Sequence, residues 1–176
     1  MTGNLGLDIA IKFFVGIFSS LVFVLLILRW LKPKLAISDK ICWKLDEKGN
    51  KFYFFKIVNM SIHNAYTVEF ELHKKTPYVV DKRKVNHHVE VIKLSREGIY
   101  SIPRRHKKIG YGEHAVLVRT FEDLAKDINE DNLEYVLFVS SKHGLSNLTK
   151  VATKSFDNSG KIHKGNFKFG SNLDVC

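Results

Sequence analysis

The stretch Ala65–Lys74 has the sequence AYTVEFELHK, in which apolar and polar side chains alternate. One set of alternate positions holds the apolar residues Tyr66, Val68, Phe70 and Leu72. The other set holds the polar residues Thr67, Glu69, Glu71 and His73. Successive side chains of a strand point to opposite faces of the sheet, so this period of two predicts a half-buried β-strand.

Similar runs lie on both sides of this stretch, and turn signals such as Lys48-Gly49-Asn50 and Asn158-Ser159-Gly160 separate them. The runs are Leu35–Lys44, Lys51–Asn59, Val85–Leu94, Ile99–Ile102, Ala115–Thr120, Leu133–Ser140 and Leu148–Phe156. About eight short strands in one domain predict a mainly β fold, either a sandwich or a barrel.

One short helix is expected within this domain, at Phe121–Ile128. Thr120 and Asp123 have the spacing of a capping box, with Asp in place of the usual Glu or Gln. The helix and its exit are acidic, with a net charge of −5 over residues 122–134.

The segment Phe13–Leu28, FFVGIFSSLVFVLLIL, contains no charged side chain. Extended to Ile9–Leu31, it contains only Lys12 and Arg29, one near each end. A helix of that length is about 30 Å long, which matches the hydrocarbon core of a bilayer. A cleaved signal peptide fits less well, because the run is too long and no small-x-small cleavage site follows. We therefore expect a transmembrane helix with its flanks at residues 1–34 and a β domain at residues 35–176.

Basic residues are common after the apolar run and scarce before it. The positive-inside rule then predicts a single-pass membrane protein, with the N-terminus outside and the β domain in the cytoplasm. The residues that would anchor the helix at the lipid interface are Arg29, Trp30, Lys32 and Lys34.

Three residues of the apolar run, Lys12, Gly16 and Ser20, are spaced four apart and therefore share one helix face. The pair Gly16 and Ser20 is a small-xxx-small pattern, which permits close approach of helices in lipid. This face is either the seam or pore lining of a helix bundle, or part of a plain anchor whose Lys12 extends to the headgroups.

The chain of 176 residues has 28 Lys and Arg against 18 Asp and Glu, a formal net charge of +10. Residues 82–108 alone carry nine basic and two acidic side chains. The basic residues form two clusters, which bracket a predicted strand pair, an arrangement that allows them to come together at the same end of the sheet. The candidate phosphate-binding residues are Lys82, Arg83, Lys84, Arg104, Arg105, Lys107 and Lys108.

These charges have two alternative roles that the sequence leaves open. They can be the solvated edge of a sheet, where charges prevent aggregation, or they can pair with the acidic stretch of a neighbouring copy. If the clusters bind a ligand, a nucleotide or oligonucleotide is more economical than chromosomal DNA for a tethered domain. Anionic lipid, bound by Arg29, Lys32 and Lys34 after the apolar run, is the second choice of anion.

The sequence contains no P-loop, GxSxG, HExxH or DxDG motif, and its eight His residues have no ligand spacing. Its two cysteines, Cys42 and Cys176, are too few for a disulfide framework. We therefore expect no enzyme activity, no catalytic residue, no metal site and no cofactor.

The C-terminal third runs through residues 135–141 (YVLFVSS), a turn at Gly144, residues 150–156 (KVATKSF) and residues 162–167 (IHKGNF). This order resembles the end of the cytoplasmic domain of inward-rectifier potassium channels. Residues 54–59 (FFKIVN) and Ala65–Leu72 are similar to the opening strands of that domain. The resemblance implies an immunoglobulin-like β-sandwich that assembles as a tetramer beneath a membrane pore.

The chain departs from those channels because it has one expected membrane helix and no TVGYG-like selectivity filter. What remains resembles the small membrane effectors of bacterial anti-phage nucleotide-signalling systems, of which the Hailong type is the best match. Such effectors respond to DNA oligomers made by a partner nucleotidyltransferase. The resemblance therefore implies a nucleotide or oligonucleotide signal, and an enzyme that makes it, encoded nearby.

The leading interpretation is a homotetrameric ion channel of anti-phage defence, gated by a ligand in a basic cytoplasmic vestibule. One alternative is a membrane-anchored β-sandwich that recruits a protein and forms no pore. The other is a β-barrel receptor for cyclic dinucleotides that disrupts the membrane.

Overall fold

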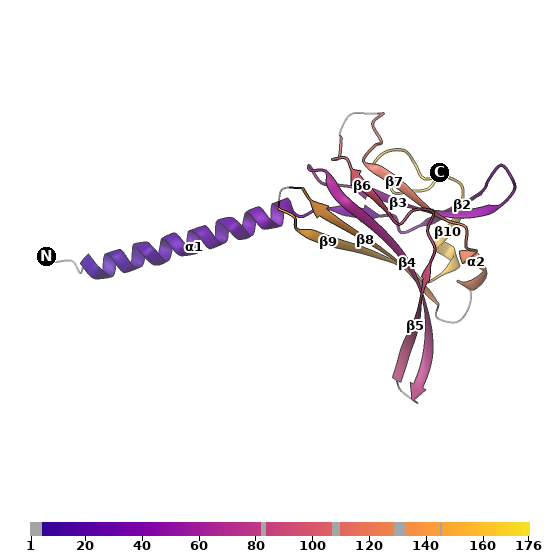
Figure 1. Cartoon of the computed structure of the whole chain (residues 1–176), viewed down its shortest axis with the longest axis horizontal. Helices are drawn as coiled ribbons and strands as arrows, with labels where there is room; N and C mark the ends of the chain where they lie inside the picture. The colour runs from indigo at the N-terminus through magenta and orange to yellow at the C-terminus, as the bar shows by residue number, and fades with distance from the viewer. Residues whose placement is uncertain (1–4, 82–83, 107–109, 129–132, 145) are drawn as a thin grey trace. The chain divides into compact units, whose positions relative to one another are not determined.

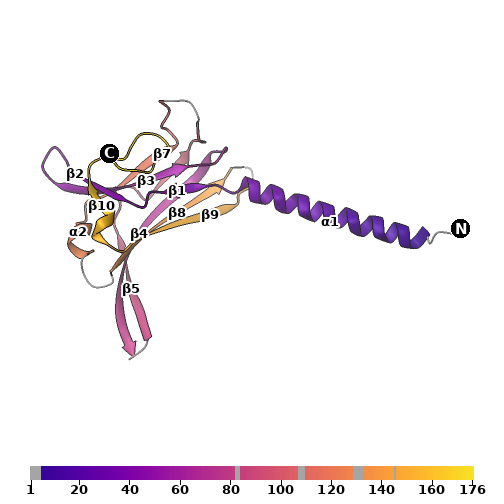
Figure 2. The same ribbon diagram turned by 180° about the vertical axis from the view of Figure 1, so that it is seen from behind.

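The computed structural model describes residues 5–81, 84–106, 110–128, 133–144 and 146–176. The chain divides into two compact units, Met1–Lys32 and Pro33–Cys176. The first contains one long helix, and the second contains two β-sheets and one short α-helix (Figures 1 and 2). The fold class expected from the sequence, mainly β with an N-terminal apolar helix, is confirmed.

The N-terminal helix α1 extends from Leu5 to Leu31. Its segment Gly6–Leu31 has a mean hydropathy of 2.6, and none of its most apolar 18-residue window is buried. By length and composition this helix can cross a membrane, although a signal sequence has the same properties. It ends two residues before Pro33, because a proline and the residue before it resist the helical conformation.

The first sheet, sheet A, is built around β3 (Lys51–Asn59). Its other strands are β1 (Leu35–Ile37), β2 (Ile41–Leu45), β7 (Ala115–Thr120) and β10 (Ile162–Lys164). Strands β1, β2 and β7 pair antiparallel with β3, whereas β10 pairs parallel with β2. The single strand expected at Leu35–Lys44 is therefore two strands.

The second sheet, sheet B, is built around β4 (Ala65–Asp81). Its other strands are β5 (Lys84–Ile92), β6 (Gly98–Ile102), β8 (Glu134–His143) and β9 (Thr149–Phe156). At 17 residues, β4 is longer than the strand expected at Ala65–Lys74. Its distal part and β5 form a hairpin that extends beyond the rest of the sheet (Figures 1 and 2).

The core lies between the two sheets and consists of alternate residues of their strands. Tyr53, Phe55 and Ile57 of β3 belong to one buried cluster with Phe70 and Leu72 of β4. Each of these five side chains is at most 1% exposed. Because the strands form two sheets, the expected sandwich is correct and the barrel alternative is wrong.

The short helix α2 consists only of Leu124–Asp127, so the helix expected at Phe121–Ile128 is half as long as predicted. Its N-cap is Asp123, whose carboxylate accepts a 3.2 Å hydrogen bond from the backbone N–H of Ala125. Thr120 does not cap the helix: its hydroxyl donates to the backbone oxygen of Lys93 and accepts from the backbone N–H of Glu122, which precedes the helix. The cap therefore lies three residues later than the capping-box spacing indicated.

The C-terminal segment, residues 165–176, packs on the outer face of sheet A, where the sequence predicted no structure. Lys56 of β3 is 3% exposed, and its ammonium donates to the backbone oxygens of Lys168 and Asn172. Phe167 contacts the ring of Phe54 edge to face, at 5.7 Å between centroids. Together these contacts bury alternate β3 residues that would otherwise face solvent.

Candidate functional site

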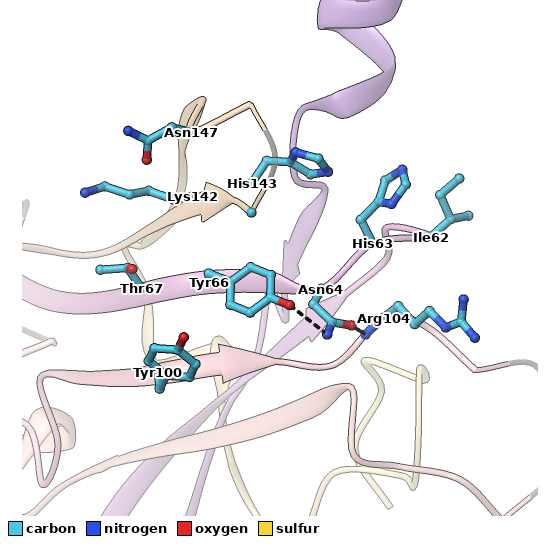
Figure 3. A pocket seen from close by; sticks show the side chains of 11 residues that line it. Ile62, His63, Asn64, Tyr66, Thr67, Tyr100, Arg104, Lys142, His143 and Asn147 are labelled. Atoms are coloured by element: carbon cyan, nitrogen blue, oxygen red, sulfur yellow. Dashed lines mark hydrogen bonds between the residues drawn. The ribbon is translucent and has the colours of Figure 1, made fainter.

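A cavity lies on the outer face of sheet B, where β4 begins and β6 and β8 end. Its volume is about 730 Å³. Tyr66 and Thr67 of β4 line it together with Tyr100 of β6 and Lys142 of β8, and Arg104 follows from the loop after β6 (Figure 3). We call this cavity the outer pocket.

A β-bulge in β4 shapes the outer pocket. Between Tyr66 and Glu69 the register of β4 against β8 shifts, because three steps along β4 match two steps along β8. Thr67 is the extra residue, and its φ of 44° lies in the left-handed region. The bulge leaves Ala65 fully buried and Tyr66 only partly buried, so the apolar face expected for Tyr66 is wrong.

Hydrogen bonds hold Tyr66 in place. Its hydroxyl accepts from the side-chain amide of Asn64 at 3.2 Å. The amide oxygen of Asn64 accepts from the backbone N–H of Arg104 at 2.9 Å, which fixes the loop after β6 (Figure 3). Gly144 makes room for the ring, since a Cβ at that position would lie 2.7 Å from Cε2 of Tyr66.

Two tyrosine rings form the aromatic part of the outer pocket. The rings of Tyr66 and Tyr100 meet edge to face, with 6.0 Å between their centroids. Tyr100 is 81% exposed, which is unusual for so large an aromatic side chain in a β-sheet. Exposed aromatic faces are the surfaces on which nucleic-acid bases stack.

The outer pocket has a positive electrostatic character. Arg104 and Lys142 supply two cations, and none of the described residues that line it is Asp or Glu. In Figure 3, Lys142 and Asn147 lie on one side of Tyr66 and Arg104 on the other. Cations, amide groups and hydroxyl groups around one cavity are the donors that phosphate oxygens require.

Two histidines form one wall of the pocket. The rings of His63 and His143 meet edge to face at 4.9 Å between centroids. Burial lowers the pKa of His143, and the neighbouring His63 lowers it further. The Nδ1 atom of His143 lies 3.1 Å from the hydroxyl of Ser146 and accepts from its backbone N–H. The side chain of His143 is therefore neutral at pH 7 and does not add a third positive charge to the pocket.

Among the described residues of the two basic clusters, Lys84 and Arg104 do not lie together within one chain. Ile102, just before Arg104, pairs with Ala65 at the start of β4. Lys84 pairs with Asp81 at the other end of the same strand. A strand of that length spans about 50 Å, so Lys84 and Arg104 lie at opposite ends of β4 and not at the same end of the sheet, as the sequence allowed. Of the candidate residues that the structure describes, Arg104 alone lines the outer pocket.

The structure describes some of the other candidate site residues but not all of them. Lys82, Arg83, Lys107 and Lys108 lie outside the described residues, and only the backbone of Lys84 is described. Arg105 is exposed, and its backbone N–H donates to the backbone oxygen of Ser61 at 3.0 Å. Among the helix candidates, Lys12, Gly16, Ser20, Arg29 and Trp30 belong to α1, and Lys32 and Lys34 follow it.

Sequence reasoning misses most of the pocket. The sequence pattern places Lys142 and His143 in a turn, but both belong to β8, and the turn follows them. The same pattern assigns Tyr66 to the core, because no sequence signal marks the bulge at Thr67. Among the described residues, no group of three or more His, Cys, Asp or Glu side chains is placed to hold a metal ion.

The β domain also contains the thiol of Cys42. It is fully buried in β2, and burial, followed by the effect of Cys176, raises its pKa to about 11. The thiol therefore stays protonated at neutral pH, and a buried thiol in that state is a poor nucleophile.

Comparison of the chain with known protein families and with curated proteins finds no match.

Proposed function

We propose that this protein is a membrane-anchored receptor and effector, which binds a nucleotide or short oligonucleotide in the outer pocket. In this proposal α1 spans the bacterial inner membrane, with the β domain in the cytoplasm. Several copies, four by resemblance to inward-rectifier channels, line an ion channel with their helices. The signal is made by a nucleotidyltransferase encoded nearby, as in anti-phage systems of the Hailong type.

The observation that carries the proposal is the composition of the outer pocket. Arg104 and Lys142 offer charge-assisted hydrogen bonds to phosphate oxygens. Tyr66 and Tyr100 offer aromatic faces beside these cations. The volume of about 730 Å³ is of the size that small-molecule sites have, about 300–1,000 Å³.

A second observation supports a link between the pocket and the helix. The backbone N–H of Lys34 donates to the hydroxyl of Ser61, at 2.8 Å. The backbone oxygen of Lys34 accepts from the backbone N–H of Met60, at 2.7 Å. Residues 60 and 61 immediately precede the pocket residues Ile62, His63 and Asn64. A ligand that moves this loop would therefore act on the segment that leaves the helix.

The need for several copies follows from the helix itself. The described residues include one helix that can cross a membrane, and one helix cannot enclose a pore. The face with Lys12, Gly16 and Ser20 permits close helix packing, and ligand binding must favour one helix arrangement over another to gate the pore.

The test measures binding of a fluorescent single-stranded oligonucleotide to the full chain in detergent. Arg104→Glu and Lys142→Glu each replace a pocket cation, and Tyr100→Ala removes an aromatic face. Lys48→Glu, in the exposed turn between β2 and β3, is the matched control, because it changes the net charge equally. The proposal predicts about tenfold weaker binding for each pocket variant and unchanged binding for the control.

If the pocket variants bind the oligonucleotide as tightly as the wild-type chain, the outer pocket is not the binding site. Equal weakening by Lys48→Glu would mean that only the overall charge attracts the oligonucleotide. Conductance of the full chain in a planar bilayer, with and without the oligonucleotide, tests the channel separately. Binding without conductance would favour an anchored recruitment module.

A further inference from the structure

Two imidazole rings and two cations line the same outer pocket. His63 lies in the loop before β4, and His143 is the last residue of β8. Their rings are 4.9 Å apart between centroids, and both line the cavity together with Arg104 and Lys142 (Figure 3). An anion bound in this cavity would therefore lie near fixed positive charges and near titratable rings at the same time.

Hydrogen bonds fix the ring of His143 in one orientation. Its Nδ1 accepts from the backbone N–H of Ser146 at 3.3 Å, so the neutral ring carries its hydrogen on Nε2. The backbone is held as well, because the carbonyl oxygen of His143 accepts from the N–H of Asn147 at 2.9 Å. The position that remains for a second proton on this ring is thus Nδ1.

Ser146 can bond to both protonation states of His143. Its hydroxyl lies 3.1 Å from Nδ1. A hydroxyl group can donate to the neutral ring or accept from the protonated ring, because its hydrogen rotates. The backbone N–H of Ser146 can only donate, so it bonds to the neutral ring alone. Protonation of Nδ1 is therefore possible, and it costs one hydrogen bond.

The pocket has no counter-charge of its own for a protonated His143. None of the described residues that line it is Asp or Glu, and its charged side chains, Arg104 and Lys142, are cations. The remaining titratable side chains that line it are those of His63, Tyr66 and Tyr100. A phosphate group bound to the two cations would supply the missing negative charge, and a nearby opposite charge favours the charged form of a titratable group.

We propose that His143 couples ligand binding in the outer pocket to proton uptake, so that a bound phosphodiester and a proton on this ring stabilise each other. The inference rests on the proposed function, because it concerns regulation of the same pocket. Without a ligand, burial and the neighbouring His63 lower the pKa of His143. An anionic charge about 6 Å away, at an effective dielectric constant of about 40, shifts the protonation equilibrium back by about tenfold.

Thermodynamic linkage gives the direction of the effect. Because the ligand binds the protonated pocket more tightly, its affinity is highest below the pKa that His143 has in the free chain. The affinity falls as the pH rises and becomes constant above the pKa that His143 has in the complex. The two limits differ by the change in the protonation equilibrium, about tenfold. Acidification of the cytoplasm would therefore increase the response to a given amount of the signal.

The first test measures the affinity of an oligothymidylate, with hydroxyl groups at both ends, for the full chain in detergent. Neither the phosphodiesters nor the bases of this probe titrate between about pH 5.5 and 8, the range in which histidine does. We expect binding to be about tenfold tighter at the acidic end for the wild-type chain, and to change by at most about twofold for His143→Gln.

His88→Gln is the matched control, because it removes an exposed imidazole of β5 that does not line the pocket. This variant should keep the tenfold change. A pH dependence that persists in His143→Gln, or that is lost equally in His88→Gln, would overturn the proposal.

The second test counts protons directly. The heat of oligothymidylate binding is measured in two buffers that differ in their enthalpy of ionisation, at the pH where the affinity changes most steeply. A tenfold change in the protonation equilibrium corresponds to the uptake of about half a proton by the wild-type chain. His143→Gln should take up at least about fivefold less. Binding by the wild-type chain without proton uptake would contradict the coupling.

Two neighbours of His143 keep the imidazole in place and shift its titration in opposite directions. His63→Gln removes the ring that lowers the pKa of His143, so the interval of proton uptake should move to higher pH. Ser146→Ala removes the hydroxyl that can accept from protonated Nδ1, so the interval should move to lower pH. The same interval in both variants would show that His143 does not take up the proton.

These outcomes separate the proton coupling from the proposed function. If the wild-type chain does not bind the oligothymidylate, or if Arg104→Glu and Lys142→Glu bind it equally well, the proposed function fails and the coupling fails with it. If the probe binds in the outer pocket without proton uptake, the coupling alone fails.

Discussion

The hydroxyl of Ser61 accepts a 2.8 Å hydrogen bond from the backbone N–H of Lys34, three positions after the last residue of α1. The same hydroxyl donates to the side-chain oxygen of Asn59, at 2.6 Å. Asn59 is fully buried, and its amide also donates to the backbone oxygens of His63, Ile102 and Pro103. One buried amide thus connects the exit of the helix, the pocket loop and the end of β6.

Ser61→Ala tests the role of this connection. The substitution removes the hydroxyl that accepts from the backbone N–H of Lys34. It leaves the outer pocket unchanged, because Ser61 does not line it. We expect oligonucleotide affinity to stay within about twofold of wild type, and stability to fall by about 1 kcal/mol for the lost hydrogen bonds. Oligonucleotide-dependent conductance should fall much further. Conductance that responds normally would show that the signal reaches the helix by another route.

Gly144→Ala tests the position of Tyr66. The added Cβ would lie 2.7 Å from Cε2 and 3.1 Å from Cδ2 of the ring, so the ring must move and its bond to Asn64 is lost. We expect about fivefold weaker oligonucleotide binding, measured by fluorescence anisotropy. Gly160→Ala, in the 3₁₀ turn η1 (Ser159–Lys161), is the control and should bind as the wild type does. Equal affinity of both variants would mean that Tyr66 does not contact the ligand.

Thr67→Gly tests the strain at the bulge. A β-branched residue with a φ of 44° is unfavourable by about 1–3 kcal/mol, and glycine removes that cost. Glycine loses about 0.5–1 kcal/mol through chain entropy, so we expect a net gain of about 1 kcal/mol in the free energy of unfolding. Urea denaturation measures it. The control Thr153→Gly, in the middle of β9, should lose about 1 kcal/mol, and a similar loss at Thr67 would argue against strain there.

The pH dependence of stability tests the buried histidines. His114 is 1% exposed, and burial lowers its pKa, with further lowering by the charges of Arg105 and Lys56. The pKa of His143 is lowered as well, chiefly by burial. Below the ordinary value of 6.5 the unfolded chain therefore binds more protons than the folded chain. Below that pH, the free energy of unfolding should therefore increase as the pH rises towards the ordinary histidine pKa. It should decrease again when the solution is acidified.

Denaturation curves between about pH 5 and 7.5 measure this slope, which is at most about 1.4 kcal/mol per pH unit for each histidine. His114→Gln should flatten it. Ser171→Ala removes the hydroxyl that lies 2.8 Å from Nε2 of His114 but no titrating group, so the slope should persist. An identical slope in His114→Gln and wild type would contradict the assignment.

The sequence predicts the elements that have a strong period and misses those that depend on distant segments. The alternation in Ala65–Lys74 indicates β4, because half-buried strands alternate, and the continuous apolar run in Lys51–Asn59 indicates β3, which is buried on both faces. The sequence pattern ends β4 too early, since Lys74, Lys75, Thr76 and Pro77 interrupt the apolar alternation. That segment is held by pairing with β5, which no local signal reveals.

The site is harder to predict than the fold, for physical reasons. The charge clusters are visible in the sequence, but their separation depends on the register of β4, which pairs with Ile102 at one end and Lys84 at the other. The outer pocket depends on one extra residue, Thr67, whose backbone conformation reverses the side to which Tyr66 points. A one-residue irregularity leaves no trace in composition or periodicity.

The C-terminal segment, residues 165–176, covers the outer face of sheet A. Ser38 donates its hydroxyl hydrogen to the backbone oxygen of Leu173 at 2.8 Å, and Lys56 is bound within the same segment, so sheet A is occupied by its own chain. Sheet B keeps a bare outer face in the described part of the chain, with the outer pocket at one end and the exposed side chains of Val79, Val85, Val89 and Val91 at the other. A partner that binds a sheet face of the β domain would therefore have to bind sheet B, because residues 165–176 already occupy sheet A.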